Sequence, residues 1–184
     1  EADTHLHIQL SQEVLPGQSV EVTLKFNLDL PPNQGRLGQH KGVTNLLNWY
    51  PILAAYSDQG WDAVPYIPWH QPWLNEAGIY TVRLRLSPGQ EAATGGHVVA
   101  RSLDATGHSI LDIEGYGLRD FTIVASDRFE VYETVSNGTP IRVLAFPEHQ
   151  GHARLCLQIA AECIEQYSDW FGPYPYQEFE LVES

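Results

Sequence analysis

Strict alternation of apolar and polar residues in several short runs constrains the fold of this chain more than any other feature. In residues 20–30 every even position is apolar and every odd position between them is polar. A period of two is typical of a β-strand with one buried face. Residues 6–10 show the same alternation, and Pro16-Gly17 marks a turn between the two runs. We therefore predict a strand in each run.

Further runs of β-forming residues predict a mainly β fold. Pro, Gly and Asn-Gly turn signals separate these runs, and no helical pattern lies between them. Antiparallel sheets packed as a β-sandwich are the architecture that such a series of strands favours. The predicted strands are 80–86, 97–103, 109–113, 121–125, 129–135 and 141–146.

The pattern changes after Pro147, where apolar residues recur at spacings of three and four. This spacing predicts an amphipathic helix over 152–171, of about five turns. Gly172-Pro173 ends it, and 179–182 begins another strand. We predict a β-sandwich domain over 1–149 and the beginning of a second domain over 150–184. The apolar stripe of the helix consists of Leu155, Ile159, Ala160, Cys163, Ile164, Tyr167 and Phe171.

An aromatic tract lies between residues 46 and 74. Its seven aromatic residues are Trp49, Tyr50, Tyr56, Trp61, Tyr66, Trp69 and Trp73, and four prolines interrupt it. Such residues commonly close the end of a sandwich or fill a contact between domains. The alternative is a carbohydrate-binding platform made of Trp61, Trp69 and Trp73, because flat indole faces stack on sugars. Burial distinguishes the two, since a platform leaves coplanar rings exposed.

Charge and composition exclude several classes of function. The chain has 184 residues, which suits one domain with a short appendage, and a net charge of −13 with ten Lys and Arg argues against nucleic acid as a partner. No apolar run approaches the roughly 20 residues that span a bilayer, and no signal peptide is visible. Cys156 and Cys163 lie about 10 Å apart along the predicted helix, too far for a disulfide. Their predicted burial as free thiols favours the cytoplasm.

No catalytic residue, cofactor-binding residue or metal ligand is assigned in this chain. The zincin motif His-Glu-x-x-His is absent, and the nearest histidine pair, His149 and His152, spans a glycine between a strand and the helix. A third ligand for that pair is not apparent. No Gly-x-Ser-x-Gly elbow occurs, and Gly95-Gly96 and Gly115-Tyr116-Gly117 are interpreted as turn glycines. The remaining histidines are scattered: His5, His7, His40, His70, His97 and His108.

Several tracts nonetheless resemble the aminopeptidase N family of zinc metallopeptidases, the gluzincins. The early tracts resemble the family's N-terminal saddle-like β-domain, and the last ones resemble the entry to its thermolysin-like catalytic domain. The helix end Tyr167-Ser168-Asp169-Trp170-Phe171 followed by Gly172-Pro173-Tyr174-Pro175-Tyr176 is the most specific. The other tracts are 47–51, 73–77, 80–86, 92–95, 119–121, 125–126 and 178–183.

The resemblance implies that the parent protein is a zinc-dependent aminopeptidase acting on peptides, and that this chain is a non-catalytic scaffold without the metal site. Zinc is then expected only in the parent's missing catalytic domain, which becomes the main partner of this chain. Residues 48–52 depart from the family motif that surrounds a substrate-binding Gln or Glu. No substrate-binding residue is therefore assigned in this chain. Self-association is a further expectation, through an open sheet edge at the N-terminal strand or through the helix stripe. The competing hypothesis is a free-standing β-sandwich binding module.

Overall fold

A computed structural model describes residues 5–62 and 74–184 of the chain. The chain divides into two compact units. The first unit comprises Glu1–Asp29 and Ile52–Glu76, and the second comprises Leu30–Pro51 and Ala77–Ser184.

In the first unit, the short strands β3 (Tyr56–Ser57) and β4 (Gly60–Trp61) form an antiparallel hairpin. Gly60 adopts a φ of 97°, a left-handed conformation that glycine reaches without steric cost. The rings of Tyr56 and Trp61 meet across the hairpin, with centroids 4.8 Å apart and planes at 66°. The hairpin therefore presents an edge-to-face aromatic pair.

The strands predicted over 6–10 and 20–30 are wrong. The intervening turn forms, with the N–H of Gln18 donating to the carbonyl oxygen of Leu15, but residues 5–30 belong to no described helix or strand. Their apolar side chains, such as Val20 and Leu24, are exposed. Alternation shows that a segment can present one apolar face, but a strand also needs a neighbour for its N–H and C=O groups. The described structure gives 5–30 no such ladder.

The second unit contains two antiparallel sheets packed face to face. One has the order β1 (Leu37–His40), β2 (Val43–Leu46), β9 (Ile123–Ser126), β6 (Glu91–Thr94), and the other has the order β5 (Gly78–Leu86), β8 (Ser109–Leu118), β7 (His97–Leu103). Buried residues of both sheets form their common core: Leu86, Ala92, Leu111, Ile113, Phe121, Ile123 and Ala125. The mainly β, sandwich-type fold predicted from the sequence is confirmed.

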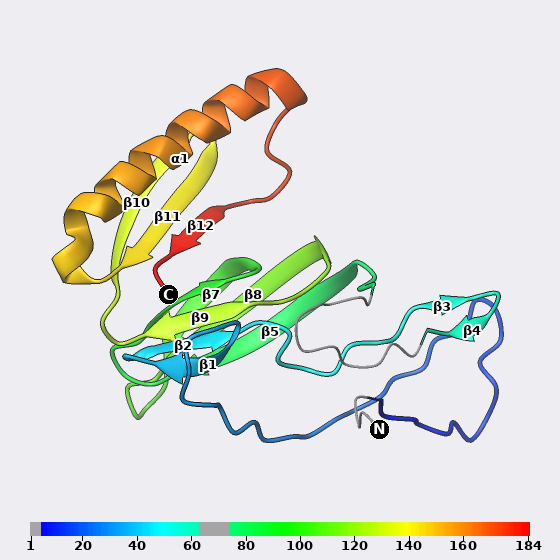
Figure 1. Ribbon diagram of the computed structural model, residues 1–184. Helices are drawn as coiled ribbons and strands as arrows, with labels where there is room; N and C mark the ends of the chain where they lie inside the picture. The colour runs from blue at the N-terminus through cyan, green and yellow to red at the C-terminus, as the bar shows by residue number, and fades with distance from the viewer. Residues whose placement is uncertain (1–4, 63–73) are drawn as a thin grey trace. The chain divides into compact units, whose positions relative to one another are not determined.

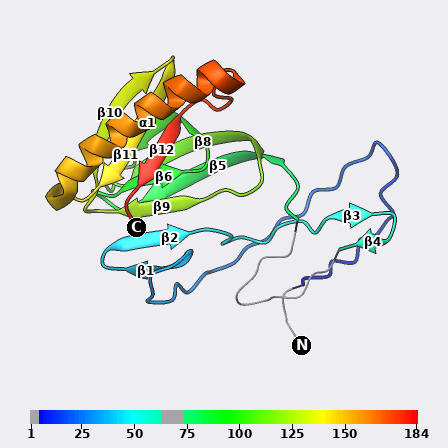
Figure 2. The same ribbon diagram turned by 45° about the horizontal axis from the view of Figure 1, so that its top comes forward.

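A third sheet and the helix lie on the other side of β9. β10 (Glu130–Ser136) pairs antiparallel with β11 (Thr139–Ala145), and β12 (Phe179–Val182) pairs parallel with β11. The 3₁₀ turn η1 (Pro147–His149) leads into α1 (Gln150–Phe171). Figures 1 and 2 show α1 lying along β10 and β11, with β12 beside β11. A long connection that includes a helix is what a parallel strand pair requires.

Alternation along single strands explains how these layers pack. In β9, Ile123 and Ala125 join the sandwich core, whereas Val124 joins a second cluster with Leu144 of β11. The opposite face of β11 places Ile141 against α1. All four residues of β9 are buried, because the strand lies between two sheets.

Most later strands match their predictions. The strand at 97–103 is found as predicted, the strand predicted at 109–113 extends to residue 118, and the helix begins two residues earlier than predicted. The strands β1, β2 and β6 were not predicted. Cys156 and Cys163 are free, but Cys156 is exposed, which contradicts the prediction that the pair lies on the buried side. In the part of the chain described here, no helix combines the length and apolar character needed to cross a bilayer.

The predicted domain boundary falls between η1 and α1. β10 and β11, which we had assigned to the sandwich, form their own sheet with β12 and contact α1. Residues on both sides of the boundary belong to the same compact unit. The division into 1–149 and 150–184 stays a prediction.

Candidate functional site

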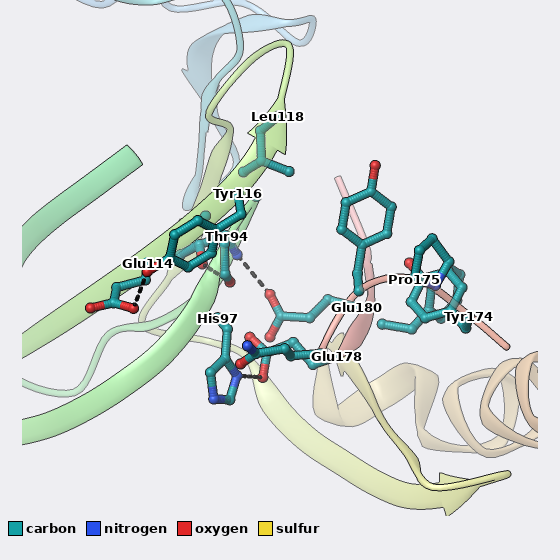
Figure 3. A pocket seen from close by; sticks show the side chains of 15 residues that line it. Thr94, His97, Glu114, Tyr116, Leu118, Tyr174, Pro175, Glu178 and Glu180 are labelled. Atoms are coloured by element: carbon teal, nitrogen blue, oxygen red, sulfur yellow. Dashed lines mark hydrogen bonds and ion pairs between the residues drawn. The ribbon is translucent and has the colours of Figure 1, made fainter. Parts of the chain in front are cut away.

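A cavity of about 330 Å³ opens in the second unit, where the segment leading into β12 faces the bend between β6 and β7. The strand β8 forms its third side (Figure 3). Carboxylates, one imidazole and tyrosine rings line it. Its lining includes Thr94, His97, Glu114, Tyr116, Glu178 and Glu180.

Glu180 is the most buried carboxylate of this site, with a side chain only 8% exposed. Residues alternate along β12, so that Phe179 and Leu181 pack towards α1 while Glu180 points to the sandwich. Its carboxylate accepts a hydrogen bond from the backbone N–H of Thr94 at 2.7 Å, and it forms an ion pair with Arg142 of β11. Burial raises the pKa of Glu180 to about 7, because desolvation outweighs the attraction of the Arg142 guanidinium.

Glu178 lies two residues earlier and contacts a different strand. Its Oε2 lies 3.0 Å from Nδ1 of His97 on β7, while its Oε1 is buried with no hydrogen-bond partner. An unpartnered buried carboxylate oxygen costs free energy, so this side chain is held there by its surroundings. A second hollow borders Glu178 on its other side, lined also by Glu91, Arg101, Glu133 and Arg142.

Gly96 allows two strands around the cavity to come close. A Cβ at Gly96 would lie 2.6 Å from the carbonyl oxygen of Glu114 in β8, whereas a Cβ at Gly115 would meet only the end of the Leu118 side chain in its own strand, at 2.4 Å from Cδ1. Gly115 lies within β8, paired with Tyr80, so its interpretation as a turn glycine is wrong.

Tyrosines form the rim of the cavity. Tyr116 donates its hydroxyl hydrogen to Glu114 at 2.9 Å, and this bond raises the pKa of the phenol. Tyr174 contacts the ring of Phe179 edge-on at 5.8 Å, and its partial burial raises its pKa as well. The site can therefore hold a proton, or receive a small polar group between carboxylates and aromatic rings.

The two histidines nearest to a zincin pattern in the sequence have different neighbours in the structure. His149 Nδ1 lies 2.6 Å from Oε1 of Glu183, and its ring is 6.3 Å from that of His152. Glu148 pairs with Arg128 instead. Within residues 5–62 and 74–184, no three His, Cys, Asp or Glu side chains gather as a metal would require. His70 lies outside the described residues, and sequence reasoning gave no signal for His97 beside Glu178.

The aromatic tract separates into buried and exposed parts. Trp49 and Tyr50 pack against the sandwich core, as expected of scaffold residues. Trp61 is 59% exposed, but its neighbour Tyr56 is tilted to it rather than coplanar. Tyr66, Trp69 and Trp73 lie outside the described residues.

Comparison with solved structures finds similar chains, one of which is described here. No family model and no curated protein matches this chain. A crystal structure of a mutant two-domain M1 zinc metallopeptidase with bound L-arginine is similar over 60% of this chain, at 16% identity and a TM-score of 0.41. The matched part amounts to 27% of that structure's chain.

Proposed function

We propose that this chain is the non-catalytic β-scaffold of an aminopeptidase N-like zinc metallopeptidase. The metal site and the peptide-cleaving residues belong to a part of the parent outside these 184 residues. The proposal rests on the family resemblance of the sequence tracts and on what those tracts do in the structure.

The observation that carries the proposal is a junction of three resembling tracts in one core. The indole N–H of Trp49 donates to the carbonyl oxygen of Phe121 at 2.9 Å. The hydroxyl of Tyr50 lies 2.9 Å from that of Tyr80 and accepts the N–H of Phe121 at 3.0 Å. Asp120 accepts hydrogen bonds from both nitrogens of Asn48. These residues hold strands together, which is a structural role.

Two further resembling tracts also meet, 92–95 and 178–183. Thr94, at the end of the resembling turn 92–95, is bonded through its N–H to Glu180 in the resembling tract 178–183. The residues that resemble the family therefore make contacts that hold the fold together, and they do not form a group of catalytic side chains.

The exposed face of α1 is where we place the parent's catalytic part. One face of the helix, with Ala160 and Ile164, is buried against β11. The neighbouring face leaves large apolar side chains exposed: Leu155, Ile159, Tyr167, Trp170 and Phe171. A contiguous apolar face of this kind marks an interaction site. Self-association of the chain through the same face is the competing outcome.

Zinc content and peptidase activity test the proposal. Both this chain and the natural protein that contains it are freed of metal, incubated with zinc and dialysed. The zinc content of each protein is then measured, and its peptidase activity is measured separately with a fluorogenic aminoacyl substrate. We expect no stoichiometric zinc and no turnover for the chain, and about one zinc with chelator-sensitive turnover for the parent. A double variant, His149→Ala with His152→Ala, serves as the control.

Two outcomes contradict the proposal. The first is one tightly held zinc per chain that the double variant loses. The second is a parent that binds no zinc and cleaves no aminoacyl substrate.

A further inference from the structure

We propose that Glu178 and Glu180 form a proton-operated clasp that closes β12 onto β6 and β7, with closure taking up a proton. The clasp is built from contacts within the second unit and does not depend on the proposed function. Its closed state is the one that the structure shows.

Geometry makes these two carboxylates the link between three sheets. Glu180 belongs to the sheet β10-β11-β12 but bonds the N–H of Thr94, at the end of β6 in the first sheet of the sandwich. Glu178 reaches His97 of β7 in the second sheet of the sandwich. Both side chains are nearly buried, at 8% and 12% exposure, so closing β12 removes both carboxylates from water.

Charged groups of the neighbouring strands surround Glu180, but only one of them pairs with it directly. Arg142 of β11 pairs with it, and the same guanidinium contacts Glu133 of β10 and Glu91 of β6. Arg101 of β7 binds Glu91 rather than Glu180. Glu178 adds negative charge beside Glu180, and Glu114 of β8 lines the same cavity. Arg142 is thus shared among three carboxylates and neutralises Glu180 incompletely.

The sign of the effect follows from burial. A carboxyl whose pKa is raised from 4.5 to about 7 binds its proton more tightly in the closed state than in the open, solvated state. Closure is therefore favoured below the open-state pKa and weakens as pH rises from the open-state value through the closed-state value.

Hydrogen exchange of the β12 segment tests the clasp. Exchange of residues 178–184 in the whole chain is measured at about pH 5.5 and about pH 8, and each rate is divided by the intrinsic rate at that pH. We expect the protection of this segment to fall by up to about thirtyfold at the higher pH. The peptide covering β8 provides the internal reference. In Glu180→Gln, which imitates the protonated acid, the fall shrinks at least about tenfold.

The matched control is Glu165→Gln, which removes an exposed carboxylate of α1 that is not among the ion-pair partners of Arg142 and keeps the wild-type pH dependence. A carbon-13 titration of the Glu180 carboxyl in the wild-type chain gives an independent reading. Titration near 4.5, or equal protection of 178–184 at both pH values, overturns the proposal. So does a Glu180→Gln variant that retains the full wild-type pH dependence.

Discussion

The indole of Trp49 and the carbonyl of Phe121 are joined by a 2.9 Å hydrogen bond between residues 72 positions apart in the sequence. Trp49 follows β2 and Phe121 precedes β9, which are neighbours in one sheet, and both side chains pack in the sandwich core. This bond joins two of the tracts that resemble the aminopeptidase N family. It supports a structural role for Trp49, which belongs to the aromatic tract but not to the predicted carbohydrate-binding platform.

Replacing Trp49 with Phe should destabilise the chain by about 1–3 kcal/mol, because the Phe121 carbonyl loses its donor and a void remains beside the core. The matched control Trp61→Phe alters an exposed ring and should change stability by less than about 0.5 kcal/mol. Urea unfolding of both variants checks this. Equal, small effects would contradict the scaffold role of Trp49.

Replacing a large side chain by alanine should affect stability differently on the two faces of α1. Ile164→Ala empties a buried position against β11 and should cost about 2–5 kcal/mol. Ile159→Ala removes an exposed side chain and should cost less than about 0.5 kcal/mol in the monomeric chain. Thermal unfolding at low protein concentration measures both. A large loss for Ile159→Ala would mean that another surface already covers that face.

Asp104 should make the loop between β7 and β8 sensitive to acid. The hydrogen bond from the Thr106 hydroxyl, followed by bonds from the His108 N–H and Arg85, lowers the pKa of Asp104 well below its ordinary value. A depressed carboxyl pKa contributes stability above the unfolded-state pKa, and this contribution is lost as pH falls through the folded-state pKa. The melting-temperature difference between wild type and Asp104→Asn should therefore narrow as pH falls from neutrality towards acid.

A glycine-to-alanine substitution should destabilise the chain at Gly96 and stabilise it at Gly151. At Gly96 the new Cβ would lie 2.6 Å from a backbone oxygen, so β7 and β8 must separate, at a cost of about 1–3 kcal/mol. At Gly151, in the first turn of α1, nothing lies within 4 Å of such a Cβ, and alanine favours the helix by up to about 1 kcal/mol. Opposite shifts in the denaturation midpoint are expected, and shifts of the same sign would contradict the close approach.

Sequence periodicity predicted strands well where one face is buried and neighbours are present. The strand at 97–103 is an example, as is the helix, whose spacing of three and four is clear. It failed at 20–30, because alternation does not supply a pairing partner. It missed β6, because Ala92 and Ala93 face different clusters and both are buried, which removes the polar alternation.

The candidate site could not be predicted from the sequence. Glu178 and Glu180 alternate with Phe179 and Leu181, a pattern equally typical of a strand whose polar face meets water. Only the packing of β12 against β6 and β7 turns that face inward, towards Thr94 and His97. Contacts between residues more than 80 positions apart leave no local signal.

Complementation tests the central claim most directly. This chain and the remaining part of its parent are produced separately, and hydrolysis of an aminoacyl substrate is measured for each and for the mixture, with and without a chelator. We predict no turnover from the chain alone and zinc-dependent turnover in the mixture. The substitution Ile159→Ser in α1 should reduce the turnover of the mixture, because it removes an apolar side chain from the exposed face. The substitution Glu165→Ser, on the exposed polar face of α1, should leave that turnover unchanged. Turnover by the chain alone, or full turnover by the remaining part without it, would contradict the account.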